Sequence, residues 1–377
     1  MVYLDYAANS KVDREVLDTF YKITDEYFAN PNSNHKLGRI VKEKIYETTK
    51  KIATRLNVLP EEIIYTSGAT ECNNLVVKGI CERYKNRGKH IILSSLEHSS
   101  LIAPATIMQD NGFDVDLIPV TKDGLIDIEE LKKLIRDDTI LVSVCSIDSE
   151  LGIKQPIEEI GKILKNYPNV FFHTDASQAI GKVNIDFTNV DLITVSPHKF
   201  YGLNGFGALI KKKAVMLKPI LNGGKSTTVY RSGTPVVGNI VALSKALEIA
   251  LDKQEERNEY VLKLNKIIVD KLKEYKGVHI NNLNNAIPYI INYSIKGVKS
   301  LDFVKILEDN DIYVSAKTSC CPTGTPSKSV YAITHDKSLA TSSIRVSLCH
   351  LTTIDEVNTF LSVFDKCYKE LEVDEKI

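Results

Sequence analysis

The chain has 377 residues, a length that favours two domains, one larger than the other, over a single core. It carries 48 Lys and Arg residues against 48 Asp and Glu residues, so its zero formal net charge provides no overall attraction to nucleic acid or to an anionic membrane. There is no apolar run of about 18 residues, and the opening MVYLDYAANS lacks the basic and apolar segments of a secretory signal. We therefore expect a cytoplasmic protein that binds neither nucleic acid nor membrane.

Seven cysteines are spread through the chain, and two of them are adjacent. Their odd number and the lack of an export signal argue against a disulfide framework and favour a reducing compartment. No CxxC pair occurs, and only His335 lies near Cys320 and Cys321, so we predict no metal site. Cys320 and Cys321 stand in a stretch rich in Ser, Thr, Gly and Pro, which is typical of a loop.

Short apolar stretches alternate with amphipathic ones over the first two thirds of the chain. This alternation predicts a mainly parallel sheet with helices on both faces. The expected strands are 62–67, 90–95, 139–146, 170–175, 192–197 and 205–212. We expect one long helix from about 236 to 275, and then short strands in AIPYIINYSI, IYVSA and SIRVSL, which indicate a smaller α+β domain.

Polar segments follow most of these strands. They are SGATECNN (67–74), LEHSS (96–100), DSELG (148–152), DASQ (175–178) and SPHK (196–199). Because ligands collect at the carboxyl ends of parallel strands, we expect these segments to converge on one rim of the sheet.

Two of the segments could hold a phosphate and a reactive amine. Gly68, Ala69 and Thr70 stand between a strand and a helix, where backbone N–H groups and a hydroxyl could bind phosphate. Simple N-capping by a hydroxyl explains the same residues. Lys199 follows a strand beside His198 and could form a Schiff base, although most lysines lie at the surface.

Two further segments supply an acid and a histidine. Asp175 ends an apolar strand and needs a partner, which is either a protonated pyridine nitrogen or the N–H groups of a helix start. His98 could exchange protons with a bound ring or be an ordinary loop residue. With Thr70 and Lys199, these residues match what pyridoxal 5′-phosphate (PLP) requires: a phosphate anchor, an imine-forming lysine and an acid for the pyridine nitrogen.

The chain resembles the class-V aminotransferase family, and within it the cysteine desulfurases of the NifS/IscS type, over nearly its whole length. The resemblance is carried by YLDYAANS, NPNSNHKLGR, YTSGATECNN, LEHSS, HTDASQAIGK, SPHKFYGLNGFGAL, RSGTP and SSIRVSL. It implies the α/β type I fold of PLP enzymes, in which helices sandwich the mainly parallel, seven-stranded sheet of a large domain, and a smaller α+β C-terminal domain completes the chain. Residues 12–255 would form the large domain, and residues 1–11 and 256–377 would form the small domain that carries the cysteine loop.

The same resemblance implies roles for the residues that bind the cofactor. Lys199 would hold PLP covalently, His98 would stack on its ring and move protons, and Asp175 would pair with the pyridine nitrogen. Gln178 would contact the phenolic oxygen of the ring. The phosphate would be bound by Gly68, Ala69, Thr70, Ser196 and His198, and by Thr234 across the interface of a homodimer.

The resemblance also implies how substrate and sulfur are handled. Asn30 and Arg345 would bind L-cysteine, with Arg345 clamping its carboxylate in the bidentate geometry of a guanidinium. SAKTSC matches SSGSAC of the family, which puts Cys320 at the position of the sulfur-accepting nucleophile. A persulfide that forms beside the cofactor must then reach an acceptor protein, so a loop suits this thiol. Cys321 is either an inert neighbour or a second sulfur carrier.

Three stretches depart from the family pattern. DSELG stands where the family has NNE(I/T)G, so Ser149 replaces an asparagine that would contact the ring oxygen. NGGKSTTVYRSGT has Lys225 in place of a glycine, and the cysteine loop reads SAKTSCC. These departures bear on substrate preference and on the sulfur acceptor.

The sequence therefore predicts a PLP-dependent cysteine desulfurase that converts L-cysteine to L-alanine. The sulfur would pass to Cys320 as a persulfide for Fe–S cluster assembly or tRNA thiolation. The alternatives are a selenocysteine lyase, another PLP-dependent C–S lyase, and a partner-activated paralogue of low activity.

Overall fold

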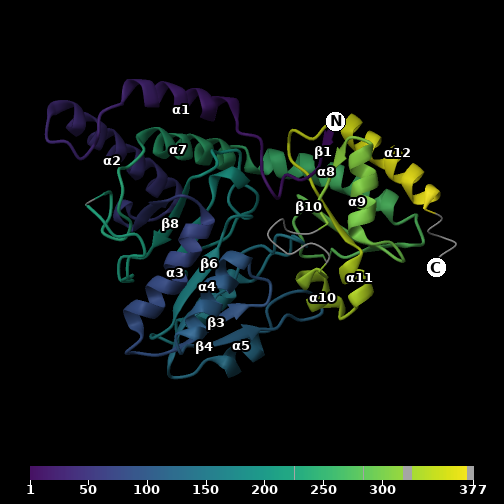
Figure 1. The fold of residues 1–377 in the computed structure, drawn as a ribbon, viewed down its shortest axis with the longest axis horizontal. Coiled ribbons are helices and arrows are strands. Elements are labelled where there is room, and N and C mark those ends of the chain that lie inside the picture. Colours follow the sequence, from purple (N-terminus) through teal and green to yellow (C-terminus); the bar gives the residue numbers. More distant parts are fainter. Residues whose placement is uncertain (225, 283, 317–324, 372–377) are drawn as a thin grey trace.

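The computed structural model describes all residues except 225, 283, 317–324 and 372–377 (Figure 1). Its α-helices are α1 (Arg14–Glu26), α2 (Lys36–Leu56), α3 (Ala69–Tyr84), α4 (Ser99–Asp110), α5 (Ile128–Leu134), α6 (Ile157–Leu164), α7 (Val237–Asp252), α8 (Gln254–Leu272), α9 (Ser300–Asp309), α10 (Lys328–Thr334), α11 (Lys337–Thr341) and α12 (Ile354–Glu370). Its strands are β1 (Val2–Tyr3), β2 (Ile63–Thr66), β3 (His90–Ser94), β4 (Asp114–Ile118), β5 (Thr139–Ser143), β6 (Phe171–Asp175), β7 (Leu192–Val195), β8 (Gly207–Lys211), β9 (Val278–Ile280), β10 (Ile290–Ile295), β11 (Ile312–Tyr313) and β12 (Ser343–Ser347). Two 3₁₀ turns, Pro60–Glu62 and Pro197–Lys199, precede β2 and follow β7.

The main sheet has seven strands in the order β2-β8-β7-β6-β5-β3-β4. Strand β8 runs antiparallel to both of its neighbours, whereas β7, β6, β5, β3 and β4 pair in parallel. Strand β5 is buried at every residue, as expected for a strand covered on both faces. The predicted α/β fold with a mainly parallel, seven-stranded sheet is therefore confirmed.

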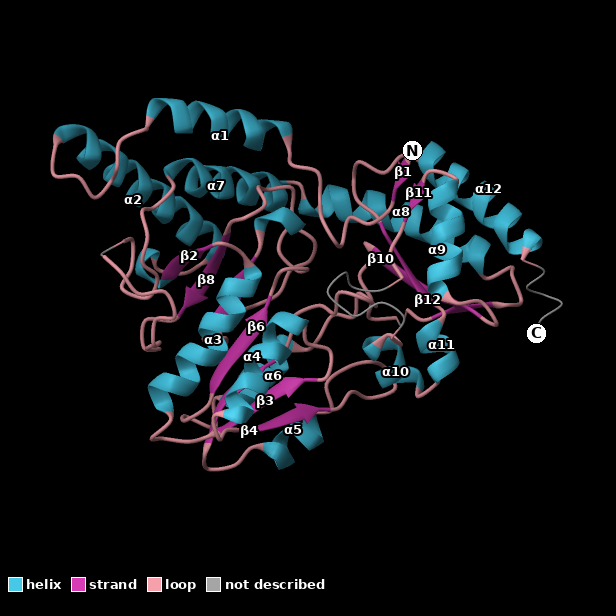
Figure 2. Ribbon diagram, in the orientation of Figure 1, coloured by secondary structure: helices cyan, strands magenta, loops and turns pink. Residues whose placement is uncertain are grey.

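Alternating side chains of the strands divide the core of the main sheet into two layers. On β3, Ile91 and Leu93 pack into the cluster that contains residues of α3 and α4. Ile92 lies between them in the chain and packs into the cluster on the other face, to which α6 and α7 contribute. This two-residue period matches the helices that cover both faces of the sheet (Figure 2).

The C-terminal part of the chain has its own antiparallel sheet, in the order β12-β10-β9. Strand β1 pairs in parallel with β11, with Val2 opposite Ile312, so the N-terminal segment lies with the C-terminal part of the chain (Figure 1). This pairing agrees with an N-terminal segment that belongs to the smaller unit. The division at residues 12–255 remains a prediction.

The single long helix expected from 236 to 275 is wrong, because the structure has two helices there. Lys253 lies between α7 and α8 with φ −104° and ψ 10°, outside the helical region. Helix α7 packs on α1 and α2, whereas α8 packs on α12 and β9. Because the two halves cover different layers, the chain has to change direction between them.

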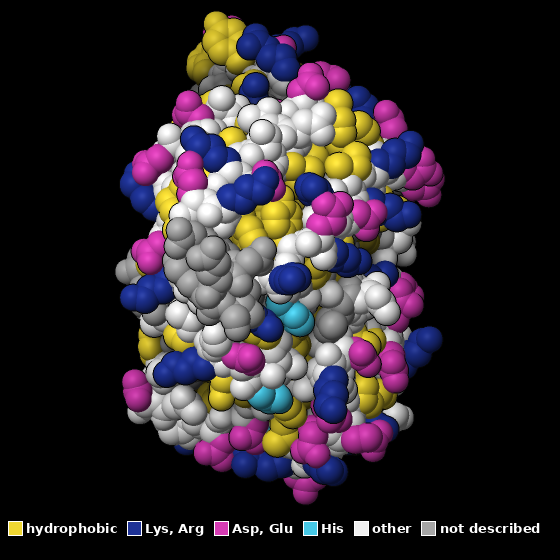
Figure 3. All heavy atoms as spheres, turned by 90° about the vertical axis from the view of Figure 1, so that its right-hand side faces the viewer, with side chains coloured by type: hydrophobic (Ala, Val, Ile, Leu, Met, Phe, Trp, Pro, Cys, Tyr) yellow, Lys and Arg dark blue, Asp and Glu magenta, His cyan; other side chains and the backbone are white. Residues whose placement is uncertain are grey.

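No helix in the described part of the chain is long and apolar enough to cross a membrane. On the face shown in Figure 3, Lys and Arg side chains are interspersed with Asp and Glu side chains and do not gather by sign. This mixed surface agrees with the equal numbers of acidic and basic residues.

Candidate active site

A cavity of about 340 Å³ lies at the carboxyl edge of the main sheet. It brings together ten of the predicted site residues, from segments far apart in the sequence. These residues are Gly68, Ala69, Thr70, His98, Asp175, Gln178, Ser196, His198, Lys199 and Arg345. The volume is in the range of small-molecule sites in proteins.

Two predicted residues do not line this cavity, and a third lies outside the described residues. Asn30 and Thr234 are exposed at the surface. Cys320 lies outside the described residues, as does Cys321. The roles assigned to all three remain predictions.

The start of α3 forms one wall of the cavity. Gly68 is the N-cap residue, and its φ of 146° is one that a residue with a side chain rarely adopts. Among the described residues no side-chain hydrogen bond caps this helix, so N-capping by a hydroxyl is not what they show. A Cβ on Gly207 would come within 2.7 Å of the Gly68 backbone, so a glycine at 207 is needed for the two backbones to lie this close together. Backbone N–H groups at such a helix start favour an anion.

Ser196 and His198 line the same cavity from the end of β7. The Ser196 hydroxyl lies 3.0 Å from Nδ1 of His198. Burial, with the charges of Lys199 and Lys182, lowers the pKa of His198 to about 4, so its ring is neutral at pH 7. A neutral imidazole and a hydroxyl can both donate to a phosphate.

Lys199 ends the 3₁₀ turn that follows β7 and is half-buried rather than exposed at the surface. Its Nζ donates to the carbonyl oxygens of Ala7, at 2.8 Å, and Ala8, at 2.6 Å. The amine is thus held on the cavity wall by a segment almost two hundred residues away in the sequence.

Asp175 ends strand β6 and Gln178 lies just after it, and both line the cavity. Asp175 Oδ1 accepts from the backbone N–H of Ser177 at 2.9 Å, and Oδ2 accepts from the Asn73 amide at 2.8 Å. Gln178 Nε2 donates to the Ala7 carbonyl at 2.9 Å. The carboxylate is therefore oriented before any ligand binds.

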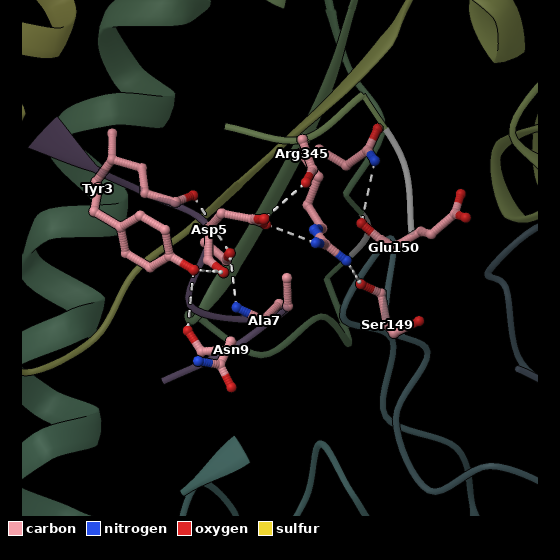
Figure 4. Close-up of polar contacts among 12 residues, drawn as sticks. Tyr3, Asp5, Ala7, Asn9, Ser149, Glu150 and Arg345 are labelled. Carbon is pink, nitrogen blue, oxygen red and sulfur yellow. Dashed lines mark hydrogen bonds and ion pairs between the residues drawn. The ribbon is translucent and has the colours of Figure 1, made fainter. Parts of the chain in front are cut away.

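Arg345 projects from β12 and is only 2% exposed. Its Nη2 lies 2.7 Å from Oδ1 of Asp5, and its Nη1 donates to the Ser149 carbonyl at 2.9 Å (Figure 4). Among the described residues, Arg345 Nε has no hydrogen-bond partner. A guanidinium held in this way is oriented and keeps donor capacity, which suits recognition of a carboxylate.

The described chain on either side of 317–324 is tied to residues next to the cavity. Ser315 Oγ donates to Oδ2 of Asp5 at 2.9 Å, and Asp5 pairs with Arg345. On the other side, Ser327 Oγ donates to the Glu150 carboxylate.

Asp148 extends this second anchor, because it accepts a hydrogen bond of 2.9 Å from Ser329 Oγ. Asp148 stands where the family has asparagine. Burial, and then the neighbouring Glu150, raises its pKa from 3.8 to about 6. The chain therefore has a buried carboxyl group, where the family has an amide, in the contact that holds Ser329.

Asp148→Asn is expected to stabilise the protein, and more so at pH 8 than at pH 5. Below pH 3.8 the carboxyl is protonated in both the folded and the unfolded protein. Because its folded pKa is about 6, the free energy of unfolding decreases as the pH rises from 3.8 through 6. At pH 8 the variant is spared the cost of burying that charge, and we expect it to gain about 1–3 kcal/mol in the free energy of unfolding. The measurement is urea unfolding at both pH values.

Asp110→Asn, at an exposed position, serves as the control and should leave the pH dependence unchanged. The explanation fails if Asp148→Asn lowers stability at pH 8, since the carboxylate would then contribute more through Ser329 and the backbone than its burial costs.

The sequence reading missed several residues that organise the cavity. Lys182 is buried, and its Nζ donates to Oε1 of Gln178 at 2.6 Å. Burial, with the charge of Lys199, lowers the pKa of Lys182 to about 7. A lysine inside the apolar run AIGKVNI was the available signal. Asp5 and Asn73 were also missed, although both lie in motifs of the family.

Comparison with known proteins defines the class to which this fold and cavity belong. Residues 2–360 match the aminotransferase class-V family, so the chain belongs to that family. It is 36% identical to the cysteine desulfurase IscS of Dictyoglomus turgidum, with 98% of this chain and 95% of that protein covered. The resemblance to NifS/IscS-type cysteine desulfurases is thereby confirmed.

Solved structures agree with this assignment. A NifS-like protein superposes with a TM-score of 0.91 at 32% identity, covering 98% of this chain and 99% of that one. A structure of SspA in complex with cysteine gives a TM-score of 0.82 at 29% identity, with 94% of this chain and all of that chain covered.

Proposed function

We propose that the protein is a PLP-dependent cysteine desulfurase that converts L-cysteine to L-alanine and passes the sulfur to Cys320 as a persulfide. One observation carries the proposal: Lys199, Asp175, Arg345 and the uncapped start of α3 all open into one cavity. An amine, an acid, a carboxylate clamp and an anion cradle are the donor set that PLP and an amino acid require together.

The residues present fit the cofactor. The start of α3, with Ser196 and His198, would hold its phosphate, Lys199 would attach it, and Asp175 would hold the proton of its pyridine nitrogen. When bound, PLP supplies an electron sink that weakens bonds at Cα of an amino acid. Gln178 would donate to the phenolic oxygen, where Ser149 replaces the family asparagine.

The protein's own groups perform the sulfur transfer. Arg345 would bind the carboxylate of L-cysteine, and His98 would assist proton transfer to the bound substrate. The Cys320 thiolate attacks the substrate sulfur, so that an S–S bond forms while the bond between Cβ and sulfur breaks. The electron pair of that bond stays with carbon, which takes up a proton and becomes the methyl group of L-alanine.

The reach of the chain supports Cys320 in this role. Cys320 lies five residues after Ser315, which is bonded to Asp5 beside Arg345. Five residues span at most about 18 Å, so Cys320 is within reach of the cavity that Arg345 lines.

The acceptor of the persulfide would be a scaffold protein for Fe–S clusters or a tRNA-thiolation enzyme. We propose a cytoplasmic homodimer in which Thr234 reaches the phosphate of the second subunit. Thr234 is exposed and lies outside the cavity of its own chain, which supports this arrangement. The apolar side chains of Tyr21 and Phe28, on or after α1, are also exposed and could be covered by a second copy.

The purified protein loaded with PLP is expected to release L-alanine and sulfide in equal amounts from L-cysteine plus a reductant. A C–S lyase working by elimination would instead release pyruvate and ammonia, so the carbon product separates the two chemistries. The measurement is quantification of alanine, pyruvate and sulfide over time.

Selenocysteine and cysteine sulfinate are tested in parallel as competing substrates. Turnover of selenocysteine alone would replace the proposal by selenocysteine lyase. A bound cofactor without turnover of any substrate would replace it by a partner-activated paralogue of low activity.

A further inference from the structure

A network of buried polar side chains lies directly beneath the cavity, and its centre is Asn73 on α3. Asn73 is completely buried, yet all the polar atoms of its amide are bonded. Its Nδ2 donates to Oδ2 of Asp175 and to Oγ of Ser100, both at 2.8 Å. Its Oδ1 accepts from the Thr194 hydroxyl at 2.8 Å.

The orientation of this amide follows from its neighbours. A carboxylate oxygen of Asp175 can only accept, so the Asn73 atom that faces it must be the nitrogen. The two hydrogens of Nδ2 are donated to Asp175 and to Ser100, so the Ser100 oxygen is an acceptor toward Asn73. The single hydrogen of the Ser100 hydroxyl is therefore free to point elsewhere.

That hydrogen points at His98. Ser100 Oγ lies 2.8 Å from Nδ1 of His98, and the backbone N–H of Ser100 donates to the same Nδ1 at 3.2 Å as the N-cap bond of α4. Nδ1 of His98 thus faces two donors. A hydrogen on this nitrogen would oppose both, so the neutral ring carries its hydrogen on Nε2.

The same direction of donation continues on the far side of Asn73. Thr194 gives its hydrogen to Asn73, so it accepts from Nε2 of His173 at 3.0 Å, and Nδ1 of His173 accepts from Ser143 at 2.8 Å. Burial lowers the pKa of His173 to about 4, which keeps that ring neutral and able to both accept and donate. Hydrogen bonds in such a directed chain polarise one another.

From these contacts we propose that Asn73 and Ser100 are positioning residues that hold His98 as the Nε2–H tautomer and, through the same amide, hold the Asp175 carboxylate. His98 then exchanges protons with a bound substrate only at Nε2, and it enters the reaction as a donor. One buried amide therefore aligns the two ionisable groups that the proposed function places against the cofactor ring. This inference rests on that function for its catalytic meaning, but the tautomer itself does not depend on it.

The cavity holds other charged or titratable groups that could compete for Nδ1 of His98. Besides Asp175, those lining it are Cys145, His198, Lys199 and Arg345. No described hydrogen bond joins any of these four to Nδ1 of His98, so Ser100 remains the group that decides its tautomer.

The test is nitrogen NMR of the full chain with ¹⁵N-labelled histidine, with and without PLP, from pH 6 to pH 8. The chain has eight histidines, and His98→Gln identifies the His98 signals. We expect an unprotonated Nδ1 and a protonated Nε2 in the wild type. Ser100→Ala should shift the appearance of the doubly protonated ring to higher pH and lower turnover of L-cysteine roughly tenfold. Ser100→Thr, which keeps the hydroxyl, should restore both.

Asn73→Ala should disturb two readouts at once. It releases the Ser100 hydroxyl, so that both tautomers of His98 appear, and it shifts the pH titration of the cofactor absorbance through Asp175. Ser100→Ala should leave that absorbance titration unchanged, because Ser100 does not touch Asp175. Ser99→Ala is the matched control at the adjacent position and should change neither readout.

The proposal is overturned if wild-type His98 carries hydrogen on Nδ1 at neutral pH, or if both variants titrate as the wild type does. If Asn73→Ala fails to fold, Thr194→Val tests the same amide from its other side and should again admit both tautomers. Inactivity toward L-cysteine with the expected tautomer would refute the proposed function and leave the network standing.

Discussion

Replacing Cys320 by alanine is expected to abolish the release of alanine from L-cysteine while the protein still binds its cofactor. The thiolate is the group that takes the sulfur, and no other side chain type supplies a comparable nucleophile. The described cysteines, at 72, 81, 145, 349 and 367, are buried. Burial raises the pKa of Cys72 and Cys145, which keeps both as unreactive thiols. We expect turnover to fall at least roughly a thousandfold.

The measurement is alanine formation by wild type, Cys320→Ala and Cys321→Ala, with the cofactor absorbance recorded for each. Cys321→Ala is the matched control, one residue along the chain, and should retain activity. If Cys320→Ala still turns over, the double variant decides: a dead double variant makes Cys321 a second sulfur carrier, whereas an active one rules out a protein persulfide.

Replacing Lys199 by alanine is expected to remove covalent attachment of the cofactor and at least roughly a thousandfold of the turnover. Lys199 Nζ is held by the carbonyls of Ala7 and Ala8 on the wall of the cavity. The buried Lys182 lies nearby, but its Nζ is bonded to Gln178. Mass spectrometry after borohydride reduction would find the cofactor on the wild type and not on the variant.

Two further variants sharpen this experiment. Lys199→Arg keeps the positive charge but offers no amine for imine formation, so it should be as inactive as the alanine variant. Lys213→Ala removes an exposed lysine and should behave as wild type. An active Lys199→Arg variant would mean that charge, rather than attachment, is what the site needs from this residue.

Much of the fold could be predicted because its strands and helices have a local pattern of apolar and polar residues. The strands that became β2, β3, β5, β6, β7 and β8 are apolar and bounded by turn residues, which is how strands covered on both faces appear in a sequence. Strand β4 was missed, since Asp114 and Asp116 interrupt its apolar pattern. Both acids are tolerated because β4 is the edge strand: Asp114 forms an ion pair with Arg136, and Asp116 accepts a hydrogen bond from the His90 ring.

In the candidate site, too, one part could be predicted from the sequence and another could not. The end of each strand marks where Thr70, His98, Asp175 and Lys199 would lie, because parallel strands bring their carboxyl ends to one edge. The environment of each group could not be predicted. The ion pair between Asp5 and Arg345 joins residues 340 positions apart. No periodicity or spacing indicates a contact of that kind.

By itself, the sequence determined most strands of the main sheet, the family, and the chemical types of the residues at the sheet edge, since these follow from local periodicity and from motifs a few residues long. Only the tertiary structure decided the protonation geometry of the site: which nitrogen of His98 accepts, what orients Asp175 and Arg345, and that Asp148 is buried beside Glu150. The physical reason is that hydrogen-bond direction and desolvation depend on atoms brought together from distant segments.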